Sequence, residues 1–290
     1  MSSSLASTER KAVPQPRWPR PLAFDASVGV HLCAGAAAWA WPGTEWWSLG
    51  ALAANHAVLT GAGLVPRSRL LGPNLRHLPA TESLPAAATG RVALTFDDGP
   101  DPEVTPRVLD QLDAAGARAT FFCIAETARR HPALTREIVA RGHSVQNHSR
   151  AHRHHFSLLG PRGFEREIGD AQALLADLTG SLPHCFRAPA GLRNPLLDPV
   201  LHRLDLHLVS WTRRGFDTVD GNVGRVLGRL VCGLAARDIL LLHDGHARVG
   251  AGGRPVVLEV LPVLLDRLRD AGLATATLAE AVPRRRAAAA

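Results

Sequence analysis

The sequence of 290 residues is poor in lysine, and this shortage bears on its partners. Lys11 is the only lysine, so arginine carries nearly all of the positive charge behind the formal net charge of +7. Beyond the N-terminal region, no stretch interleaves basic with aromatic residues, as a nucleic-acid-binding surface does. The basic balance therefore reflects an arginine-rich composition, and we expect no nucleic-acid partner.

The sequence also lacks closely spaced cysteines. Its four cysteines lie far apart, and no two of them form a C-x-x-C pair. This spacing argues against a zinc–thiolate site or a redox dithiol, and it fits a reducing compartment. The hydrophobic fraction of 46% is enough to bury one large core over this length, which excludes a wholly disordered chain.

One stretch near the N-terminus, 21–66, has no lysine or arginine, and its formally charged side chains are Asp25 and Glu45. It contains two apolar runs, 26–41 and 47–65, separated by the turn sequence Pro-Gly-Thr-Glu. As helices the runs would be about 24 and 28 Å long, close to the roughly 30 Å of a bilayer core. They predict a hydrophobic helical hairpin that associates with membrane lipid. The alternative is a pair of helices buried against a soluble domain.

Tryptophans and arginines predict how this hairpin would lie in a bilayer. Five of the six tryptophans precede residue 48, and four of these cluster around the turn, where an interfacial belt would lie. Arginines flank both runs on their outer sides, and positive flanks favour the cytoplasm. If both runs cross, we expect the rest of the chain on the cytoplasmic face of a bacterial-type inner membrane; if only one run crosses, the orientation reverses.

The chain divides into five segments by composition. We expect a basic, disordered N-terminus at 1–20, the hairpin at 21–66, a linker at 67–90, a catalytic domain at 91–280 and a frayed tail at 281–290. Within the fourth segment, strand-length apolar runs alternate with helix-like periodic stretches. This alternation predicts an α/β fold with a parallel sheet or barrel, and with its chemistry at the carboxyl ends of the strands.

The boundaries of these elements follow from the apolar pattern. Strands are predicted at 92–96, 120–124, 185–186, 206–211, 239–242 and 274–278. Helices are predicted at 104–115, 132–141, 163–178, 223–234 and 256–271.

Polar residues follow several of these strands. Asp97 and Asp98 end the first one, and adjacent side chains on a strand point to opposite faces, so one carboxylate can bind a cation while the other acts as a base. The alternative is an Asx-type turn that only stops the strand. His148 and His152 have the spacing of two imidazoles on one helical face, which suits a single metal ion. A histidine-rich surface loop is the alternative there.

Three further polar groups occur later in the chain. The sequence Arg-Ala-Pro-Ala-Gly at 187–191 follows a predicted strand, 211–217 follows another, and His243 ends a third. Two imidazoles with one carboxylate form the ligand set of an open catalytic zinc site, which keeps one position for water. Five polar groups at strand ends favour one active site over separate structural roles.

Four of these motifs occur in the order and approximate spacing of a known family: TFDDG at 95–99, HSxxH at 148–152, RxPxG at 187–191 and LLLH at 240–243. Over about residues 91–280 the sequence resembles the polysaccharide deacetylases, also called NodB-homology domains or carbohydrate esterase family four. The resemblance implies a distorted (β/α) barrel and metal-dependent removal of N- or O-acetyl groups from sugars.

The resemblance also implies roles for five residues. Asp97 would be the general base, and Arg187 would hold it by a charge-assisted pair. The backbone N–H of Ala190 would stabilise the oxyanion. His243 would be the general acid, oriented by Asp217.

The same resemblance implies a metal site and a substrate site. Three residues would bind one divalent ion: Asp98, His148 and His152. Zn²⁺ is favoured, and Co²⁺, Ni²⁺ and Mn²⁺ also suit this ligand set. Four residues would contact the substrate: Pro189, Trp211, Arg214 and Leu241, the last against the acetyl methyl group.

Three positions depart from the family's pattern. Ala190 stands where a tyrosine is common, Arg214 where an aspartate is common, and Thr218 where a tryptophan is common. Arg213 or Arg214 would suit an anionic group such as a lipid pyrophosphate. The alternative for these two arginines is a solvated charge pair beside the pocket.

We therefore expect a membrane-associated, metal-dependent deacetylase that acts on an N-acetylated amino sugar in a glycan or a lipid-linked saccharide. The alternatives are a deformylase or O-deacetylase with the same site, and a catalytically inactive glycan-binding membrane protein. An inactive binder would be expected to lose Asp97 or His243, and both are present.

Overall fold

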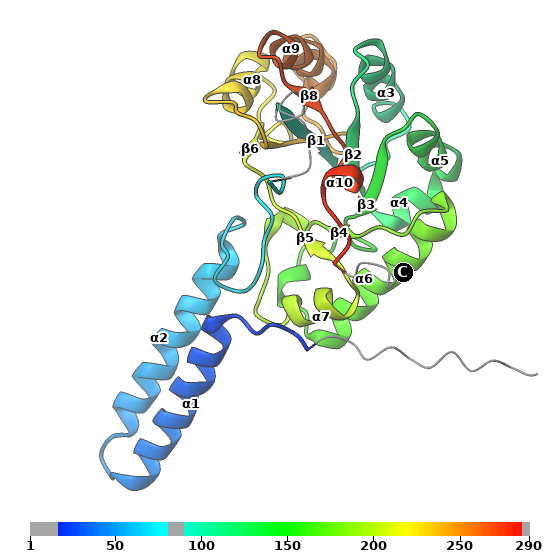
Figure 1. Cartoon of the computed structure of the whole chain (residues 1–290). Coiled ribbons are helices and arrows are strands. Elements are labelled where there is room, and N and C mark those ends of the chain that lie inside the picture. The colour runs from blue at the N-terminus through cyan, green and yellow to red at the C-terminus, as the bar shows by residue number, and fades with distance from the viewer. Residues whose placement is uncertain (1–16, 81–89, 286–290) are drawn as a thin grey trace, which may run out of the picture.

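The computed structural model describes residues 17–80 and 90–285 of the chain. Most of the predicted disordered N-terminus, much of the predicted linker and the end of the predicted tail lie outside the described residues. The described residues form an α/β domain from which a pair of helices projects (Figure 1).

An eight-stranded parallel sheet forms the centre of the domain, in the order β5-β4-β3-β2-β1-β7-β6, with β8 beside β1. The strands are β1 (Arg91–Asp97), β2 (Ala119–Cys123), β3 (Ser144–Asn147), β4 (Cys185–Phe186), β5 (His207–Leu208), β6 (Arg213–Arg214), β7 (Ile239–His243) and β8 (Ala274–Thr275). In the register of β1, Asp97 lies beside Phe122 of β2 and His243 of β7. The carboxyl ends of the central strands therefore meet at one edge, as the predicted distorted barrel requires.

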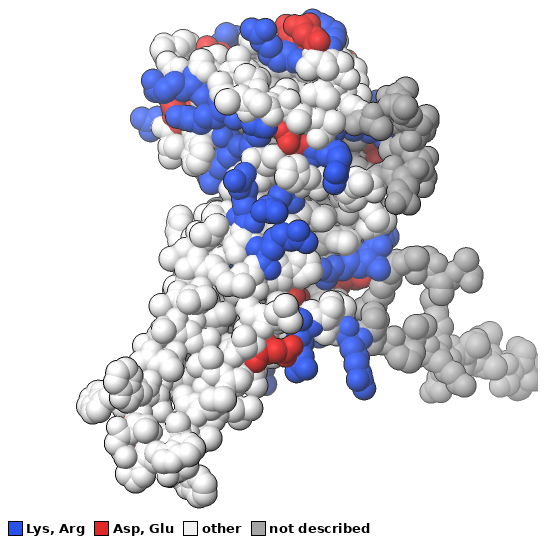
Figure 2. All heavy atoms as spheres, turned by 60° about the vertical axis from the view of Figure 1, so that its left-hand side comes forward, with Lys and Arg blue, Asp and Glu red and all other residues white. Residues whose placement is uncertain are grey.

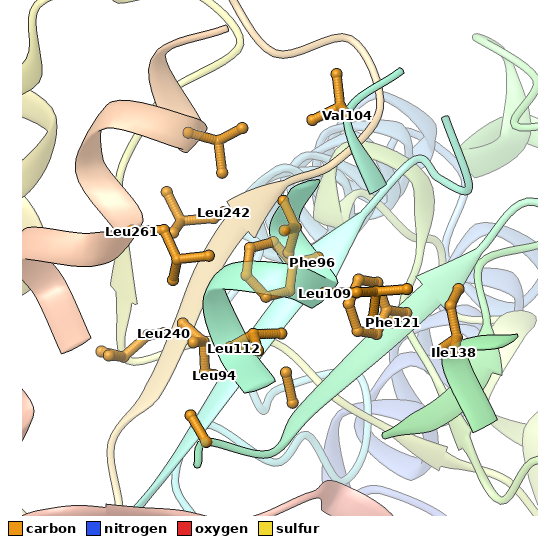
Figure 3. Close-up of a cluster of buried hydrophobic side chains, with 14 of the residues drawn as sticks. Leu94, Phe96, Val104, Leu109, Leu112, Phe121, Ile138, Leu240, Leu242 and Leu261 are labelled. Atoms are coloured by element: carbon orange, nitrogen blue, oxygen red, sulfur yellow. The ribbon is translucent and has the colours of Figure 1, made fainter. Parts of the chain in front are cut away.

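The central strands are buried on both faces, and the two faces have different neighbours. Leu94 and Phe96 of β1 share a hydrophobic cluster with Phe121 of β2 and Leu242 of β7 (Figure 3). Because side chains alternate along a strand, Asp97 points away from this cluster and borders a cavity. The packing of one face thus fixes the direction of a carboxylate on the other.

The α-helices of the domain are α3 (Thr105–Ala114), α4 (Ala125–Arg130), α5 (Pro132–Ala140), α6 (Pro161–Thr179), α7 (Leu197–Arg203), α8 (Val223–Val231), α9 (Val256–Asp270) and α10 (Leu278–Ala281). Helices α3 to α9 surround the curled sheet, whereas α10 packs inside the curl, where Leu278 shares a cluster with Phe122 and Leu241 (Figure 1). All five helices predicted from periodicity are present. The strand predicted at 274–278 is shorter than expected, because Thr277 and Glu280 form a capping box that starts α10.

Part of the predicted linker is bonded to the domain. Leu75 N–H donates to the Leu208 carbonyl at 2.9 Å, and Ser210 N–H donates to the Leu75 carbonyl at 2.8 Å. Leu78 N–H donates to the carbonyl of Arg237, just before β7, at 2.8 Å. This segment therefore spans from one end of the curled sheet toward the other.

The two apolar runs form α1 (Leu22–Ala40) and α2 (Glu45–Leu64), which lie side by side and which we call the helix pair (Figure 1). Asn55 donates to the Ser27 hydroxyl across the pair at 2.9 Å. The tryptophans near the distal turn are 64–88% exposed: Trp39, Trp41, Trp46 and Trp47. Of the described helices, α1 alone has the length and mean hydropathy of a membrane span.

Candidate active site

The five polar groups predicted from the sequence border one cavity of about 180 Å³ at the carboxyl ends of the strands. Its lining consists of Asp97, Asp98, His148, His152, Ala190, Gly191, Trp211, Arg214, Thr218, Leu241, His243 and His246. A larger apolar cavity, of about 600 Å³, lies between the helix pair and the domain and contains none of these residues.

Asp98, His148 and His152 form a cluster suited to a metal ion. Asp98 Oδ1 lies 3.2 Å from His148 Nε2 and 3.3 Å from His152 Nε2, and the three ligand atoms lie within 4.8 Å of one another. Among the described residues this buried oxygen has no hydrogen-bond partner. A carboxylate oxygen and two imidazole nitrogens that converge in this way fit a divalent cation.

The loop that carries the two histidines corrects one prediction. The i, i+4 spacing predicts one helical face, but β3 ends at Asn147 and the residues from His148 to His155 form no helix. Ser149 and His152 have left-handed backbones, with φ of 67° and 49°. Asn147 Oδ1 accepts from Ser149 N–H at 2.9 Å, and Ser149 Oγ accepts from His152 N–H at 3.0 Å. These side-chain bonds compete with helix formation and fold the loop back over the strand end.

An outer hydrogen bond orients His148. Its Nδ1 lies 2.8 Å from the Arg187 carbonyl, which can only accept, so Nδ1 carries the hydrogen and Nε2 faces Asp98. Burial opposes ionisation of Asp98, but the neighbouring imidazoles of His148, His243 and His152 together outweigh it and hold the pKa of the carboxyl well below its usual range. Asp98 is therefore poised as an anionic ligand.

Asp97 is held on the other side by Arg187. The Arg187 side chain is fully buried, and its Nη1 donates to Asp97 Oδ1 at 2.7 Å and to Thr95 Oγ1 at 2.8 Å. Nη2 donates to the Ser210 carbonyl at 3.0 Å, and the guanidinium carbon lies 4.1 Å from the centre of the Phe122 ring. These contacts leave Asp97 Oδ2 directed toward the metal cluster, 3.9 Å from His148 Nε2.

Strand alternation predicts that Asp97 and Asp98 point to opposite faces, and this prediction is wrong. The strand ends at Asp97, and Asp98 has a left-handed backbone with φ of 73°. This turn brings both side chains to the same cavity. The neighbouring Gly99 has no room for a side chain, because an added Cβ would lie 2.1 Å from an oxygen of Asp244.

His243 and Asp217 form a second buried pair. Asp217 Oδ1 accepts from His243 Nδ1, and its Oδ2 accepts from His243 N–H, both at 2.8 Å. Burial lowers the pKa of His243, but the hydrogen bond and charge of Asp217 outweigh it and raise the pKa above its ordinary value. The raised pKa favours the protonated imidazole, whose Nε2 faces the cavity and can act as an acid.

The predicted substrate residues are brought together with one exception. Leu241 and Trp211 line the cavity, and Arg214 lies over the Trp211 ring at 5.2 Å. Ala190 is exposed in the turn after β4, with a φ of 53°. Pro189 is buried in the same turn and is not part of the cavity lining.

Arg213 does not serve the anionic-substrate role considered for it. Its Nε donates to Asp238 Oδ2 at 2.5 Å, and its other nitrogens donate to the carbonyls of Cys232 and Gly233. A guanidinium with these partners is committed to the fold. His154 and His155, the remaining histidines of the loop, are exposed and do not join the metal cluster.

Sequence reasoning missed two residues near the centre. His246 lines the cavity, and its Nδ1 lies 3.6 Å from Asp98 Oδ2; its signal was a second histidine three residues after His243. Asp244 lies beneath the site, where burial raises its pKa to about 7 and Thr105 Oγ1 donates to it at 2.6 Å. No pattern in the sequence separates this buried carboxyl from a surface one.

The chain matches known proteins over this domain. Residues 86–209 match the family model described as polysaccharide deacetylase. A chitooligosaccharide deacetylase of Sinorhizobium fredii is 32% identical over 207 residues, which cover 68% of this chain and 95% of the relative. A peptidoglycan-N-acetylglucosamine deacetylase of Listeria monocytogenes is 30% identical over 211 residues, which cover 71% of this chain. The chain spans only 43% of that longer relative.

A solved structure agrees with the fold. The family 4 acetyl xylan esterase from Clostridium thermocellum, in complex with a cobalt ion, matches with a TM-score of 0.58 and 30% identity. The match covers 65% of this chain and 88% of that chain. Together with the motifs and the parallel sheet, these likenesses show that the chain belongs to the polysaccharide deacetylase family, which is carbohydrate esterase family four.

Proposed function

We propose that the protein is a metal-dependent deacetylase that hydrolyses the acetamide of an N-acetylated amino sugar. The observation that carries this proposal is one constellation: three ligand atoms meet beside a carboxylate on one side and a paired imidazole on the other. The names of the two curated relatives, which act on chitooligosaccharide and on peptidoglycan N-acetylglucosamine, support the substrate class.

Asp98, His148 and His152 would hold one divalent ion. A metal bound there polarises the acetyl carbonyl and makes a water molecule more acidic, which are the chemical contributions such a site supplies. We propose Zn²⁺ for its preference for nitrogen and oxygen ligands in an open site. The cobalt ion of the Clostridium esterase supports a divalent ion of this class.

Asp97 would take the proton from the attacking water. Its carboxylate is held by Arg187, so it meets the water in one orientation. As the water oxygen adds to the carbonyl carbon, negative charge develops on the carbonyl oxygen, and the Ala190 N–H would donate to it. Leu241, buried in the cavity floor, would contact the acetyl methyl group.

His243 would complete the reaction as the general acid. The carbon–nitrogen bond breaks only if the amine nitrogen is protonated as it leaves, and the imidazolium of His243, favoured by its raised pKa, would supply that proton. Asp217 stabilises the charged imidazole and fixes its orientation. Acetate and the free amino sugar are the products.

The direct test is acetate release by the purified full chain from N-acetylated chitooligosaccharide and from peptidoglycan. We expect hydrolysis that a chelator abolishes and that added Zn²⁺ restores. A folded protein that releases no acetate under any metal would contradict the proposal.

O-deacetylation by the same site is a second candidate, favoured by the likeness to an acetyl xylan esterase. An alkoxide leaves more readily than an unprotonated amine, so an ester substrate would depend less on His243. Comparing acetylated xylan with chitooligosaccharide distinguishes the two. A higher kcat/KM on the xylan would favour the esterase.

We further propose that the helix pair holds the protein in a membrane with the domain on the cytoplasmic face. The exposed tryptophans at the distal turn and the arginines at the base support this placement. Cys232 of the domain is exposed, so a membrane-impermeant maleimide should label it only after cell lysis. A Cys232→Ser chain is the control, and labelling of Cys232 in intact cells would reverse the orientation.

A further inference from the structure

A further concave surface lies at the base of the helix pair, apart from the active-site cavity and from the apolar cavity between the helix pair and the domain. It is a groove of about 660 Å³, which we call the basal groove. One side is apolar: Val58, Gly61 and Ala62 share one face of α2 at spacings of three and four, and Val65, which follows the helix, continues that side. The other side carries three arginines from the segment after α2: Arg67, Arg69 and Arg76.

The three guanidinium groups have no ion-pair partner among residues 17–80 and 90–285. Several other arginines of the domain pair with carboxylates, as Arg141 does with Asp110 at 2.7 Å. Three unneutralised positive charges around one groove are complementary to a group with several negative oxygens, such as a phosphate or diphosphate.

The position of the groove adds a requirement for hydrocarbon. Figure 2 shows basic side chains gathered where the helix pair, which has no lysine or arginine, meets the domain. Val58 and Val65 on the apolar side are 59% and 54% exposed. An anion held by the arginines would therefore lie at the level of lipid headgroups, with an apolar chain attached to it lying along α2.

The basal groove is also joined to the loops of the active site. Arg67 Nη1 donates to the carbonyl of Thr212 at 2.8 Å, and Thr212 follows Trp211, which lines the cavity. An added Cβ on Gly191, another lining residue, would lie 2.6 Å from Pro66 at the end of α2. Thr212 is thus the one residue between Arg67 of the groove and Trp211 of the cavity wall. Pro66 likewise lies between the groove and Gly191 of that wall.

We propose that the basal groove binds the phosphate linker of a lipid-linked N-acetylamino sugar, whose sugar enters the neighbouring cavity. The prenyl or acyl chain lies against the apolar face of α2, and the arginines neutralise the linker. This inference rests on the proposed deacetylase function and names its substrate class.

The test measures binding, so that it does not depend on turnover. The full chain is placed in phosphatidylcholine nanodiscs and titrated with N-acetylglucosamine joined through a diphosphate to a short prenyl chain. The test variant is Arg69→Gln/Arg76→Gln. The control is Arg129→Gln/Arg136→Gln, which removes the same charge from exposed sites on α4 and α5. Thermal melting confirms that both variants fold.

We expect the wild-type chain to bind this probe more tightly than N,N′-diacetylchitobiose. The test variant should weaken the probe's Kd by about tenfold or more, as expected when charge-assisted contacts are lost, and the control should not. Equal Kd values for the test and control variants would overturn the inference. Equal competition by phosphatidylglycerol or by inorganic pyrophosphate would also overturn it, since the groove would then be a general anion site.

Acetate release from the same samples separates the two proposals. If the arginines govern probe binding but no substrate is hydrolysed, the deacetylase function fails and the lipid-phosphate site stands. If chitooligosaccharide is hydrolysed and the arginine variants bind the probe like the wild type, the function stands and the lipid-linked substrate is wrong.

Discussion

The catalytic centre and the helix pair differ in how their side chains are partnered: the first buries charged groups in hydrogen bonds, and the second exposes apolar groups. The buried charge of Arg187 has four hydrogen-bond acceptors within the domain, and Asp217 has two donors from His243 alone. The helix pair leaves Trp39 88% exposed, and its apolar side chains face outward along most of its length. The catalytic centre thus pairs most of its buried polar groups inside the domain, whereas the helix pair exposes a long apolar surface among the described residues.

The largest expected effect is the loss of activity when the general base is removed from the catalytic centre. We expect Asp97→Asn to lower kcat by roughly 10²- to 10⁴-fold, because the amide keeps the shape but cannot accept the proton. Metal content should stay the same, since Asp97 is not one of the converging ligands. Steady-state kinetics with elemental analysis check both parts. A variant with wild-type kcat would remove Asp97 from the mechanism.

The second largest effect is expected on stability, when the buried ion pair between Arg187 and Asp97 is broken. Arg187→Met leaves Asp97 without its partner in a buried site, and we expect a loss of about 3–5 kcal/mol in the free energy of unfolding. Denaturant titration measures this loss. The matched variant Arg203→Met breaks an exposed pair with Glu165 and should cost at most about 1 kcal/mol. Similar losses in the two variants would contradict the distinction between the buried and exposed pairs.

A buried histidine away from the site should make stability depend on pH. His143 Nδ1 accepts from Ala119 N–H at 3.2 Å, and burial lowers the pKa of His143 to about 4, against the opposing charge of Asp113. The unfolded chain takes up this proton at about pH 6.5, so stability should fall as pH drops from about 6.5 to 4, by up to about 3 kcal/mol.

His143→Gln keeps an acceptor but cannot titrate, so its stability curve should be flatter over this range. Urea titrations at several pH values measure the slope for both proteins. An unchanged slope in the variant would show that His143 is not the titrating group.

The smallest effect on folding is expected at the tip of the helix pair. Trp46 and Trp47 are each 82% exposed, so replacing both with serine should change the free energy of unfolding of the domain by no more than about 0.5 kcal/mol. The same change should reduce the membrane-bound fraction in a flotation assay, because it removes interfacial aromatic rings. A large loss of domain stability would mean that the tip packs against protein.

Long apolar patterns predicted much of the fold, and short polar strands escaped prediction. The strands β1, β2 and β7 are buried on both faces, so each is a continuous apolar run that the sequence predicts as a strand. β3 was missed because its polar residues are satisfied only in the folded chain: Gln146 Oε1 accepts from the N–H groups of His184 and Cys185 at 3.0 and 2.8 Å. β6 consists of two arginines and has no apolar signal.

The residues of the site were predictable from motif spacing, but their local geometry was not. The left-handed backbones of Asp98, Ser149 and His152 lie beyond the ends of β1 and β3, where the apolar pattern gives no signal. The place of Arg213 among loop carbonyls depends on tertiary contacts. The sequence therefore predicted which residues form the site, whereas the orientations of their side chains and the distances between them became known only from the structure.

The measurement that tests the central claim most directly is metal binding by His148→Ala beside the wild-type chain. Elemental analysis and competition with a chromophoric chelator give the stoichiometry and the affinity. We expect one equivalent of metal per wild-type chain, and at least about a tenfold to hundredfold loss of affinity in the variant, because one of three convergent ligands is gone. Unchanged metal content and affinity in His148→Ala would contradict the assignment of Asp98, His148 and His152 as the metal site.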